Sequence, residues 1–370
     1  MAHHPTRVVV NLQAIRDNVR TLRVRLGPRT AIMAVVKANA YGHGDLAVAR
    51  AALEAGATWC GVATLEEAIR LREGGIKASL LVMGYTPPAA VAEVLHYNVR
   101  ITLFSLADAA AFARFAQASQ KPIRAHIKLD TGMGRLGFLP TEAPAALEAL
   151  RQQPGLVIEG AFTHLCCAES DPDFSRHQIA QFDVLTRHLG LPWRHACNSA
   201  GALSYPEGRF DMVRVGLVTY GLSPWGAQPP AEMMEGFRPA LSLRTRIVSL
   251  KTLPDGAGVG YGARYRCAGE RRIAVIPIGY GDGFRRAPTH FGEVLVRGQR
   301  APVVGSVCMD QSMLDVTHIA DVQVGDEVVV IGEQGLDCIT AEEVAARLGT
   351  INYEVVTALS ARPRREYVSL

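Results

Sequence analysis

Short apolar runs alternate with longer segments of helical periodicity between about Thr30 and Gly221. This alternation is typical of repeated βα units around a parallel sheet. Helical segments are expected at residues 45–55 and 174–189, among others. The runs that read as strands end near Lys37, Val62, Val82, Phe104, Leu129, His164, Cys197 and Arg214. Such units predict a closed (β/α)8 barrel, although an open, doubly wound sheet is also compatible with the number of strands.

Polar residues at the ends of these runs favour the barrel. Lys37, His164, Asn198 with Ser199, and Arg214 each fall at the carboxyl end of a predicted strand, and Arg135 lies in the loop after the fifth. Barrel enzymes hold their chemistry on that face, whereas an open sheet gathers ligands mainly at one switch point. The expected fold class is therefore α/β, with a TIM-type barrel in the N-terminal part.

A second, mainly β domain is expected to follow. Residues 223–240 are dense in proline and glycine without a clear period, which is typical of a domain crossover. After Leu241 the apolar segments are short and closely spaced by turn residues, and only residues 340–349 have the clear pattern of a helix. We therefore assign residues 1–235 to the barrel and residues 236–370 to the β-rich domain.

Composition narrows the range of partners. The 370 residues carry a formal charge of +4, from 39 basic and 35 acidic side chains without long blocks of either sign, so nucleic acid is not expected. The seven cysteines are odd in number and lack CxxC spacing, which indicates reduced thiols in the cytoplasm; no metal is expected. No apolar run approaches the ~20 residues of a membrane helix, and no signal peptide is visible.

The segment AVVKANAYGHG, residues 34–44, places Lys37 where an apolar strand ends. A lysine there would face the mouth of a barrel, and partial desolvation would lower the pKa of its amine. An unprotonated amine can react with the aldehyde of a cofactor. From position alone, a solvated lysine at a strand end is the favoured interpretation.

This segment closely resembles the cofactor-lysine segment of alanine racemases, a family of fold-type III pyridoxal-phosphate enzymes. The resemblance extends from about Val8 to the last strand, because further matching segments follow in the same chain order: KLDTGMGRLG (128–137), FTH (162–164), CNSAG (197–201), VRVGLVTYG (213–221), GVGYG (258–262), GYGDG (279–283), VCMDQ (307–311) and NYEV (352–355). It implies an isomerase that interconverts L- and D-alanine and supplies D-alanine for peptidoglycan.

The resemblance implies a site for pyridoxal 5'-phosphate in the barrel. Lys37 would hold the cofactor and act as one acid/base. The phosphate would be bound by Tyr41, Ser199, Gly216, Leu217 and Tyr353, with Asn198 beside them. Loops after the seventh and eighth strands of a barrel commonly bind phosphate. Without the resemblance, a serine between a strand and a helix would be interpreted as an N-cap.

Arg214 would, by resemblance, face the pyridine nitrogen of the cofactor. A guanidinium with a pKa above about 12 does not readily give up a proton, so the nitrogen would stay unprotonated. This favours return of a proton to the substrate α-carbon over transamination. Taken alone, Arg214 would also suit a structural salt bridge at the barrel rim.

Racemisation needs an acid/base on each face of the substrate α-carbon, and one tethered lysine cannot easily serve both. The resemblance assigns the second role to Tyr261 of the GVGYG segment, which reaches the site of a partner subunit. His164 would link Tyr261 to Arg214 and help to stabilise the tyrosinate. A homodimer with composite active sites follows. Taken alone, His164 would be interpreted as a buried structural histidine.

Arg135 and the backbone N–H of Met309 are the expected anchors of the substrate carboxylate. Family members often carry a carbamylated lysine at the position of Lys128, whose negative charge would orient Arg135; an ordinary ion pair with Asp130 would look the same in sequence. Tyr280, Asp310 and Tyr353 would line the entrance and favour a substrate with a methyl side chain. Departures from the family pattern at Leu165, Val215 and Leu217 are apolar exchanges.

Two alternatives belong to other functional classes. A decarboxylase of the same architecture would also use Lys37, but it is expected to place an acidic residue at the ring nitrogen, so Arg214 and the GVGYG tyrosine argue against it. A non-enzymatic pyridoxal-phosphate carrier would need the barrel alone. The additional domain with Tyr261 and Met309 would then have no purpose.

Overall fold

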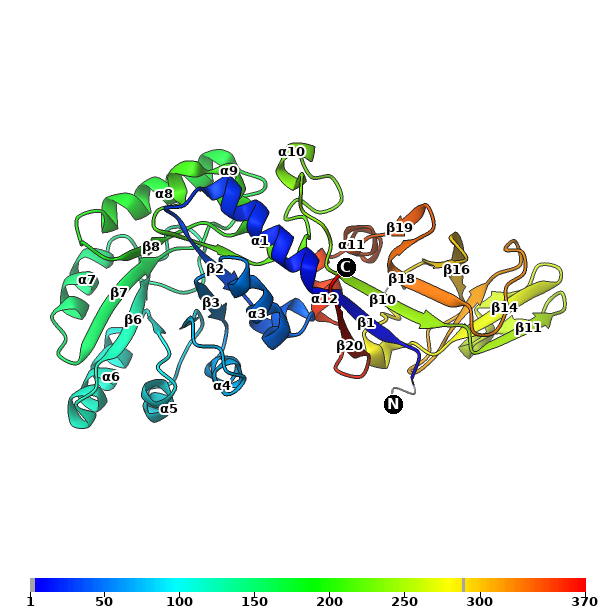
Figure 1. The fold of residues 1–370 in the computed structure, drawn as a ribbon, viewed down its shortest axis with the longest axis horizontal. Coiled ribbons are helices and arrows are strands. Elements are labelled where there is room, and N and C mark those ends of the chain that lie inside the picture. Colours follow the sequence, from blue (N-terminus) through cyan, green and yellow to red (C-terminus); the bar gives the residue numbers. More distant parts are fainter. Residues whose placement is uncertain (1–3, 288–289) are drawn as a thin grey trace.

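The computed structural model describes residues 4–287 and 290–370. Residues 1–3, the start of the first predicted domain and of the segment examined for a signal peptide, lie outside that range. Two parts lie side by side along the long axis of the molecule, a helix-rich part and a strand-rich part (Figure 1). Within the described residues, no helix combines the length and the apolar character needed to cross a membrane.

The helix-rich part is the predicted barrel. Its parallel strands form two four-stranded sheets, in the orders β4-β3-β2-β9 and β5-β6-β7-β8. Their bounds are β2 (Ala31–Val35), β3 (Trp59–Val62), β4 (Ser79–Val82), β5 (Ile101–Leu103), β6 (Ile123–Lys128), β7 (Leu156–Phe162), β8 (Trp193–His195) and β9 (Met212–Val215). Each strand ends within two residues of the predicted position.

Backbone hydrogen bonds join the two sheets on both sides. Val82 donates to the Arg100 carbonyl at 2.9 Å beside β4 and β5, and Arg214 donates to the Cys197 carbonyl at 3.0 Å beside β8 and β9. The eight strands therefore close into a ring, which confirms the predicted barrel over the open sheet.

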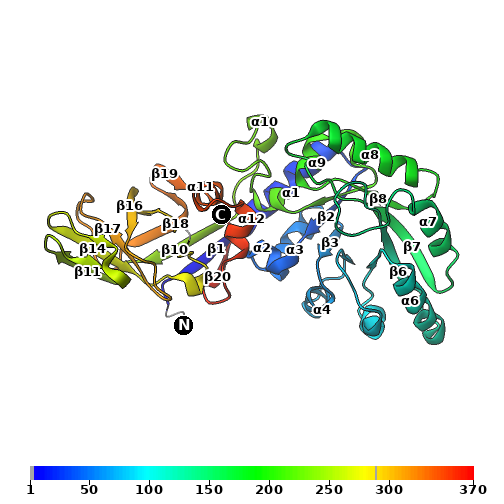
Figure 2. The ribbon, with the colours of Figure 1, turned by 180° about the vertical axis from the view of Figure 1, so that it is seen from behind.

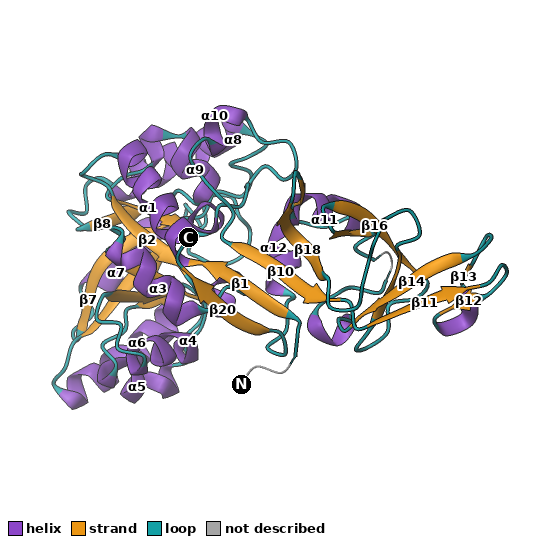
Figure 3. Cartoon of the chain, turned by 45° about the vertical axis from the view of Figure 1, so that its right-hand side comes forward, coloured by secondary structure: helices purple, strands orange, loops and turns teal. Residues whose placement is uncertain are grey.

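Helices cover the outside of the ring (Figure 3). In α1, Ile15, Val19, Leu22 and Leu26 are buried at a spacing of three or four residues, so one apolar face packs on the barrel. The helices of this part are α1 (Leu12–Leu26), α2 (Lys37–Tyr41), α3 (Asp45–Glu54), α4 (Leu65–Glu73), η1 (Pro88–Ala90), α5 (Val91–His96), α6 (Leu106–Ser119), α7 (Ala143–Arg151), α8 (Pro172–Thr186), α9 (Ser199–Ser204), η2 (Pro206–Gly208) and η3 (Leu217–Tyr220). The predicted helices at 45–55 and 174–189 correspond to α3 and α8.

The strand-rich part is a mainly β structure, as predicted. Its large sheet has the order β11-β14-β17-β16-β15-β18-β10-β1-β20, with β19 paired to β18, and β12 and β13 form a separate hairpin. The bounds are β1 (Arg7–Asn11), β10 (Leu241–Arg246), β11 (Ser249–Leu253), β12 (Gly258–Val259), β13 (Tyr265–Arg266), β14 (Arg271–Ile276), β15 (Glu293–Val296), β16 (Gln299–Val304), β17 (Ser312–Asp315), β18 (Glu327–Gln334), β19 (Asp337–Ile339) and β20 (Arg364–Val368).

The first strand departs from the predicted domain assignment. Although residues 1–235 were assigned to the barrel, β1 pairs antiparallel with β10 and parallel with β20 in the other part. The chain then enters the barrel through α1. The first strand therefore belongs to the strand-rich part, and the helix that follows it belongs to the barrel (Figure 2). The division at residue 235 itself stays a prediction.

Short helices complete the second part: η4 (Tyr261–Ala263), η5 (Tyr280–Asp282), α11 (Ala341–Leu348) and α12 (Asn352–Thr357). One more short helix, α10 (Ala231–Met234), lies in the crossover segment, where Arg25 of α1 donates to the Met233 carbonyl at 2.8 Å. The helix expected at 340–349 is α11. The sequence pattern did not reveal α12, because six residues are too few to show a helical period. This helix matters for the site, since it brings the Tyr353 ring to 5.9 Å from the Tyr41 ring.

Candidate functional site

A cavity of about 420 Å³ opens at the carboxyl ends of the barrel strands. All nine residues predicted for the cofactor site line it, together with Lys128 and Arg135. Tyr353 comes from α12, and the others come from the ends of different strands around the ring. The predicted residues in its lining are Lys37, Tyr41, Lys128, Arg135, His164, Asn198, Ser199, Arg214, Gly216, Leu217 and Tyr353. The fold thus gathers in one place residues that are far apart in the sequence.

Lys37 begins α2, directly after β2. The next four residues, Ala38 to Tyr41, have φ values between 51° and 54°, a left-handed turn that costs about 1–2 kcal/mol per residue without glycine. Glu67 stabilises this turn, because its carboxylate accepts the Ala38 N–H at 2.7 Å. Strain held in this way at a cavity wall is a common feature of functional sites.

The amine of Lys37 is half-buried in the cavity wall. Desolvation lowers its pKa, the positive charges of Arg135 and Arg214 lower it further, and Glu67 acts in the opposite direction. A larger fraction of the amine is therefore unprotonated near neutral pH than for a solvated lysine.

Arg214 is buried at the floor of the cavity. One guanidinium nitrogen donates to the His195 carbonyl and to His195 Nδ1, both at 2.9 Å. The other donates to the carbonyls of Thr163 and Ala196, and to His164 Nδ1 at 3.3 Å. Within the described residues no carboxylate contributes to its electrostatic environment, so Arg214 is not part of a rim salt bridge, and burial lowers its pKa to about 10.

Two buried histidines that sequence analysis missed support Arg214. Because a guanidinium only donates, His195 Nδ1 must accept, and its proton lies on Nε2. That proton can be donated to His126 Nδ1, 2.8 Å away, which leaves the second proton on His126 Nε2, a buried atom without a partner. Burial lowers the pKa of His126 to about 3 and that of His195 well below its usual value, so both rings are neutral.

The same reasoning applies to His164 at the cavity rim. Its Nδ1 accepts from Arg214, so its proton lies on Nε2 and can be donated to another group. Burial, followed by the charge of Arg214, lowers the pKa of His164 well below its usual value. His164 is therefore a neutral hydrogen-bond donor beside the cavity.

We expect Arg214→Lys to lower the free energy of unfolding by about 3 kcal/mol, because one ammonium cannot satisfy the three carbonyls and two imidazoles that the guanidinium bonds. Urea unfolding measures the change. Arg187→Lys, at a surface position where the side chain is 63% exposed, is the matched control and should change stability little. Equal stability of the two variants would contradict this role of Arg214.

Ser199 and Asn198 have separate roles in the structure. Asn198, rather than Ser199, caps α9 by accepting the Gly201 N–H at 2.9 Å. Ser199 Oγ instead accepts the backbone N–H of Gly216 at 3.0 Å, which draws the loops after β8 and β9 together. The N-cap interpretation of Ser199 is thereby excluded.

The wall near Ser199 fits an anionic group. A Cβ atom on Gly216 would lie 2.6 Å from the Tyr41 hydroxyl, so glycine leaves a space at this point. Burial raises the pKa of Tyr41 and raises that of Tyr353 to about 12, so both hydroxyls keep their protons and can donate. Three hydroxyls and a glycine-containing loop are the groups that commonly cradle a phosphate.

Lys128 and Asp130 are not paired as the sequence alternative suggested. The carboxylate of Asp130 accepts backbone N–H groups from residues 132–135, at 2.8 to 3.0 Å. This wraps the loop around Asp130 and presents Arg135 to the cavity. The Lys128 amine donates to the Leu129 carbonyl at 2.7 Å, and burial, followed by the charge of Arg214, lowers its pKa to about 7.

Of the predicted site residues in the second part, Tyr353 lines this cavity, but Tyr261, Tyr280, Met309 and Asp310 do not line it in their own chain. Tyr261, Tyr280 and Met309 are 68%, 43% and 53% exposed on its surface. Asp310 is ion-paired with Arg362 at 2.7 Å, a contact that the sequence did not reveal. These side chains are therefore accessible to another molecule.

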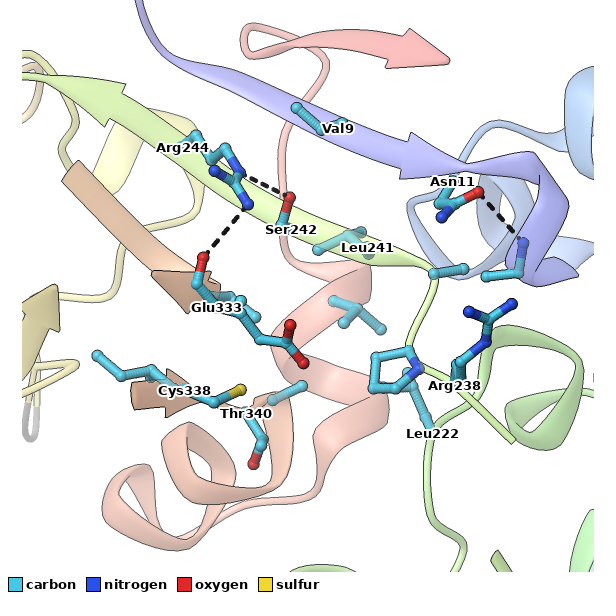
Figure 4. A pocket seen from close by; sticks show the side chains of 18 of the residues that line it. Val9, Asn11, Leu222, Arg238, Leu241, Ser242, Arg244, Glu333, Cys338 and Thr340 are labelled. Carbon is cyan, nitrogen blue, oxygen red and sulfur yellow. Dashed lines mark hydrogen bonds between the residues drawn. The ribbon is translucent and has the colours of Figure 1, made fainter. Parts of the chain in front are cut away.

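A second cavity, of about 570 Å³, lies where β1 and β10 face the start of α11 (Figure 4). Figure 4 shows Arg244 of β10 reaching toward the carbonyl of Glu333 across it, a contact of 3.4 Å. This second cavity is larger than the barrel cavity, but none of the predicted site residues line it. Arg244 and Arg7 are both paired with Glu327, so we do not assign chemistry to this cavity.

Comparison with known families agrees with this geometry. Residues 10–224 match the model of the alanine racemase N-terminal domain, and residues 240–367 match that of the alanine racemase C-terminal domain. The chain belongs to the alanine racemase family. Both the barrel and the β-rich part are thus family features.

Individual members of the alanine racemase family are similar over nearly the whole chain. An alanine racemase of Desulforamulus reducens is 44% identical over 97% of this chain and 98% of its own length. The alanine racemase of Bacillus anthracis, solved with bound L-Ala-P, is 37% identical with a TM-score of 0.93, over 100% of this chain and 96% of its own. A histidine racemase of Leuconostoc mesenteroides is 30% identical with a TM-score of 0.89, over 100% of this chain and 99% of its own.

Proposed function

We propose that this chain is a pyridoxal-phosphate-dependent alanine racemase, active as a homodimer in the cytoplasm, where it supplies D-alanine for peptidoglycan. The observation that carries the proposal is the shared cavity of Lys37 and Arg214, where an amine of lowered pKa and a buried cation without a carboxylate partner line the same wall space. The absence of an acidic group near Arg214 within the described residues argues against the decarboxylase.

The residues of the cavity fit the cofactor. When bound, pyridoxal phosphate supplies an electron-withdrawing system that acidifies the α-hydrogen of an amino acid. Lys37 would hold its aldehyde carbon, and the hydroxyls of Tyr41, Ser199 and Tyr353 would bind its phosphate. Arg214 would face the pyridine nitrogen, and because a pKa of about 10 keeps the guanidinium protonated at neutral pH, it would donate a hydrogen bond to that nitrogen without transferring its proton.

Proton transfer on the two faces of the substrate would be divided between Lys37 and Tyr261. The phenol of Tyr261 is exposed and lies outside the cavity of its own chain, so we assign this role to the partner subunit's Tyr261. His164 can donate its Nε2 proton to that phenol when it carries negative charge, which would stabilise the anion. Each active site would then be composite.

Substrate selection would depend on both subunits. Arg135 at the cavity and the partner's Met309 N–H would anchor the carboxylate. Tyr353, together with the partner's Tyr280 and the partner's Asp310, would narrow the entrance. Alanine is the favoured substrate because the two alanine racemases described above are 37% and 44% identical to this chain, whereas the histidine racemase is 30% identical.

Incubation of the purified protein with L-alanine in heavy water tests this proposal, with L-histidine as the competing substrate. We expect D-alanine to appear with deuterium at the α-carbon. Carbon dioxide release would identify a decarboxylase instead, and a greater rate with histidine would overturn the assignment of substrate.

We expect Lys128 to be carbamylated at alkaline pH. With a pKa of about 7, most of its amine is neutral above pH 7, and a neutral amine adds carbon dioxide to give a carbamate and a proton. The negative charge formed would lie near Arg135 and hold it in place. Protein equilibrated with ¹³C-labelled bicarbonate should show a carbamate signal that decreases as the pH falls below about 7. Lys128→Met should lack it; an unchanged signal in that variant would contradict the assignment.

A further inference from the structure

Two adjacent thiols occupy the loop between β7 and α8. The Sγ atoms of Cys166 and Cys167 are 3.6 Å apart, Cys166 is exposed and Cys167 is half-buried. Of the other cysteines, three are buried and Cys308 and Cys338 are partly exposed. Neither the family assignment nor the proposed racemase chemistry uses the adjacent pair.

Hydrogen bonds hold the backbone on both sides of the pair. The Leu165 carbonyl accepts from Asn198 Nδ2 at 3.3 Å, and the Cys166 N–H donates to Gln178 Oε1 at 3.1 Å. Beyond the thiols, the Ala168 carbonyl accepts from the Tyr205 hydroxyl at 3.0 Å.

The turn that follows adds a further restraint. The Cys167 carbonyl accepts the N–H groups of Ser170 at 3.0 Å and Asp171 at 2.9 Å. The backbone that carries both thiols is therefore largely fixed before a ligand arrives, which lowers the entropic cost of binding both sulfurs at once.

The surroundings select the class of ligand. Among the described residues no group of three or more histidine, cysteine, aspartate or glutamate side chains is placed to hold a metal ion. A transition-metal ion such as zinc normally requires four ligands. Trivalent arsenic that carries one organic group needs only two thiols to complete its three bonds. Two adjacent cysteines can therefore supply all of its remaining ligands.

We propose that Cys166 and Cys167 form a dithiol site for trivalent arsenicals. In the reaction with an arsine oxide, both S–H bonds and the arsenic–oxygen bond break and two As–S bonds form. The oxygen leaves with the two thiol protons as water, and arsenic stays trivalent, so no oxidant or reductant is required. Partial desolvation, followed by the hydrogen bond with the Cys167 thiol, raises the pKa of Cys166 to about 11, and the protonated thiol that results is the form consumed in this condensation.

Phenylarsine oxide is the probe, added in equimolar amount to the reduced, full-length, cofactor-loaded protein. Intact mass spectrometry should show one phenylarsenic group per chain, and peptide mapping should place it on residues 166 and 167. The adduct should survive excess monothiol and be released by 2,3-dimercaptopropanol. Arsenous acid added first should reduce labelling.

Matched variants distinguish binding that requires both thiols from binding to a single thiol. Cys166→Ser and Cys167→Ser should each weaken binding by about 100-fold or more, because the second As–S bond is lost. Cys338→Ser, at another partly exposed thiol, should bind like the unmodified chain. Retained affinity in either loop variant would overturn the proposal, as would the absence of an adduct or its location on another cysteine. The mapping result on the unmodified chain decides the question even if a variant fails to fold.

Discussion

Lys37→Ala protein is expected to interconvert the alanine enantiomers about 10⁴-fold more slowly than the unmodified chain, because the substitution removes both the covalent holder of the cofactor and one of the two acid/base groups. The rate is followed by a D-alanine-specific assay. A second readout is independent of activity: after borohydride reduction and gel filtration, the unmodified chain should retain the cofactor and the variant should not.

Lys121→Ala is the matched control, because Lys121 is exposed at the opposite end of the barrel, just before β6 begins. It should behave like the unmodified chain in both measurements. Covalent retention of the cofactor by the Lys37 variant would show that another amine holds it. The assignment of Lys37 would then be wrong even if the fold and the family remain as described.

The barrel could be predicted because its evidence is local. Each βα unit carries its own apolar run and helical period, and polar residues at the strand ends indicated the face that holds the cavity. If the strands are assumed to close into a ring, the sequence alone predicts that Lys37, His164 and Arg214 lie together. The structure adds the distances between these residues and leaves their predicted grouping unchanged.

The position of β1 could not be predicted in the same way. RVVVN shows the alternating burial of a strand, with Val8 and Val10 inside, but that pattern does not identify its neighbours. Its partners β10 and β20 lie more than two hundred residues away in the sequence. Pairing between distant segments depends on the whole fold, so the first strand was assigned to the wrong part.

Two structural features that stabilise the site could not be predicted from the sequence, for a different reason. His126 and His195 lie inside strands, where a polar residue reads as a satisfied core side chain, and only the barrel geometry brings them to Arg214. The left-handed turn after Lys37 was also hidden, because alanine and tyrosine give no signal for positive φ. Tyr353 was named from the family resemblance alone.

Tyr261→Phe is expected to slow racemisation by about 10²–10⁴-fold, because the variant lacks the acid/base group on one face of the α-carbon. Exchange of the α-hydrogen with heavy water separates the faces. We expect L-alanine to lose most of its exchange, whereas D-alanine should still exchange through Lys37. The cofactor should stay attached, since Lys37 and the hydroxyls proposed to bind the phosphate are unchanged in this variant. Equal loss of exchange from both enantiomers would contradict this division of roles.

The same variant also tests whether the site is composite. A homodimer that pairs Lys37 of one chain with the partner's Tyr261 should regain activity when Lys37→Ala and Tyr261→Phe proteins are unfolded, mixed in equal amounts and refolded together. Random pairing makes half of the dimers mixed, and each mixed dimer has one intact site and one doubly defective site, so about a quarter of the original activity should return. Tyr265→Phe, which removes a hydroxyl bonded to Asp315 instead, is the control and should leave activity nearly unchanged. If the mixture stays as inactive as its components, the two residues act within one chain, and the exposed position of Tyr261 would require a large rearrangement of the strand-rich part.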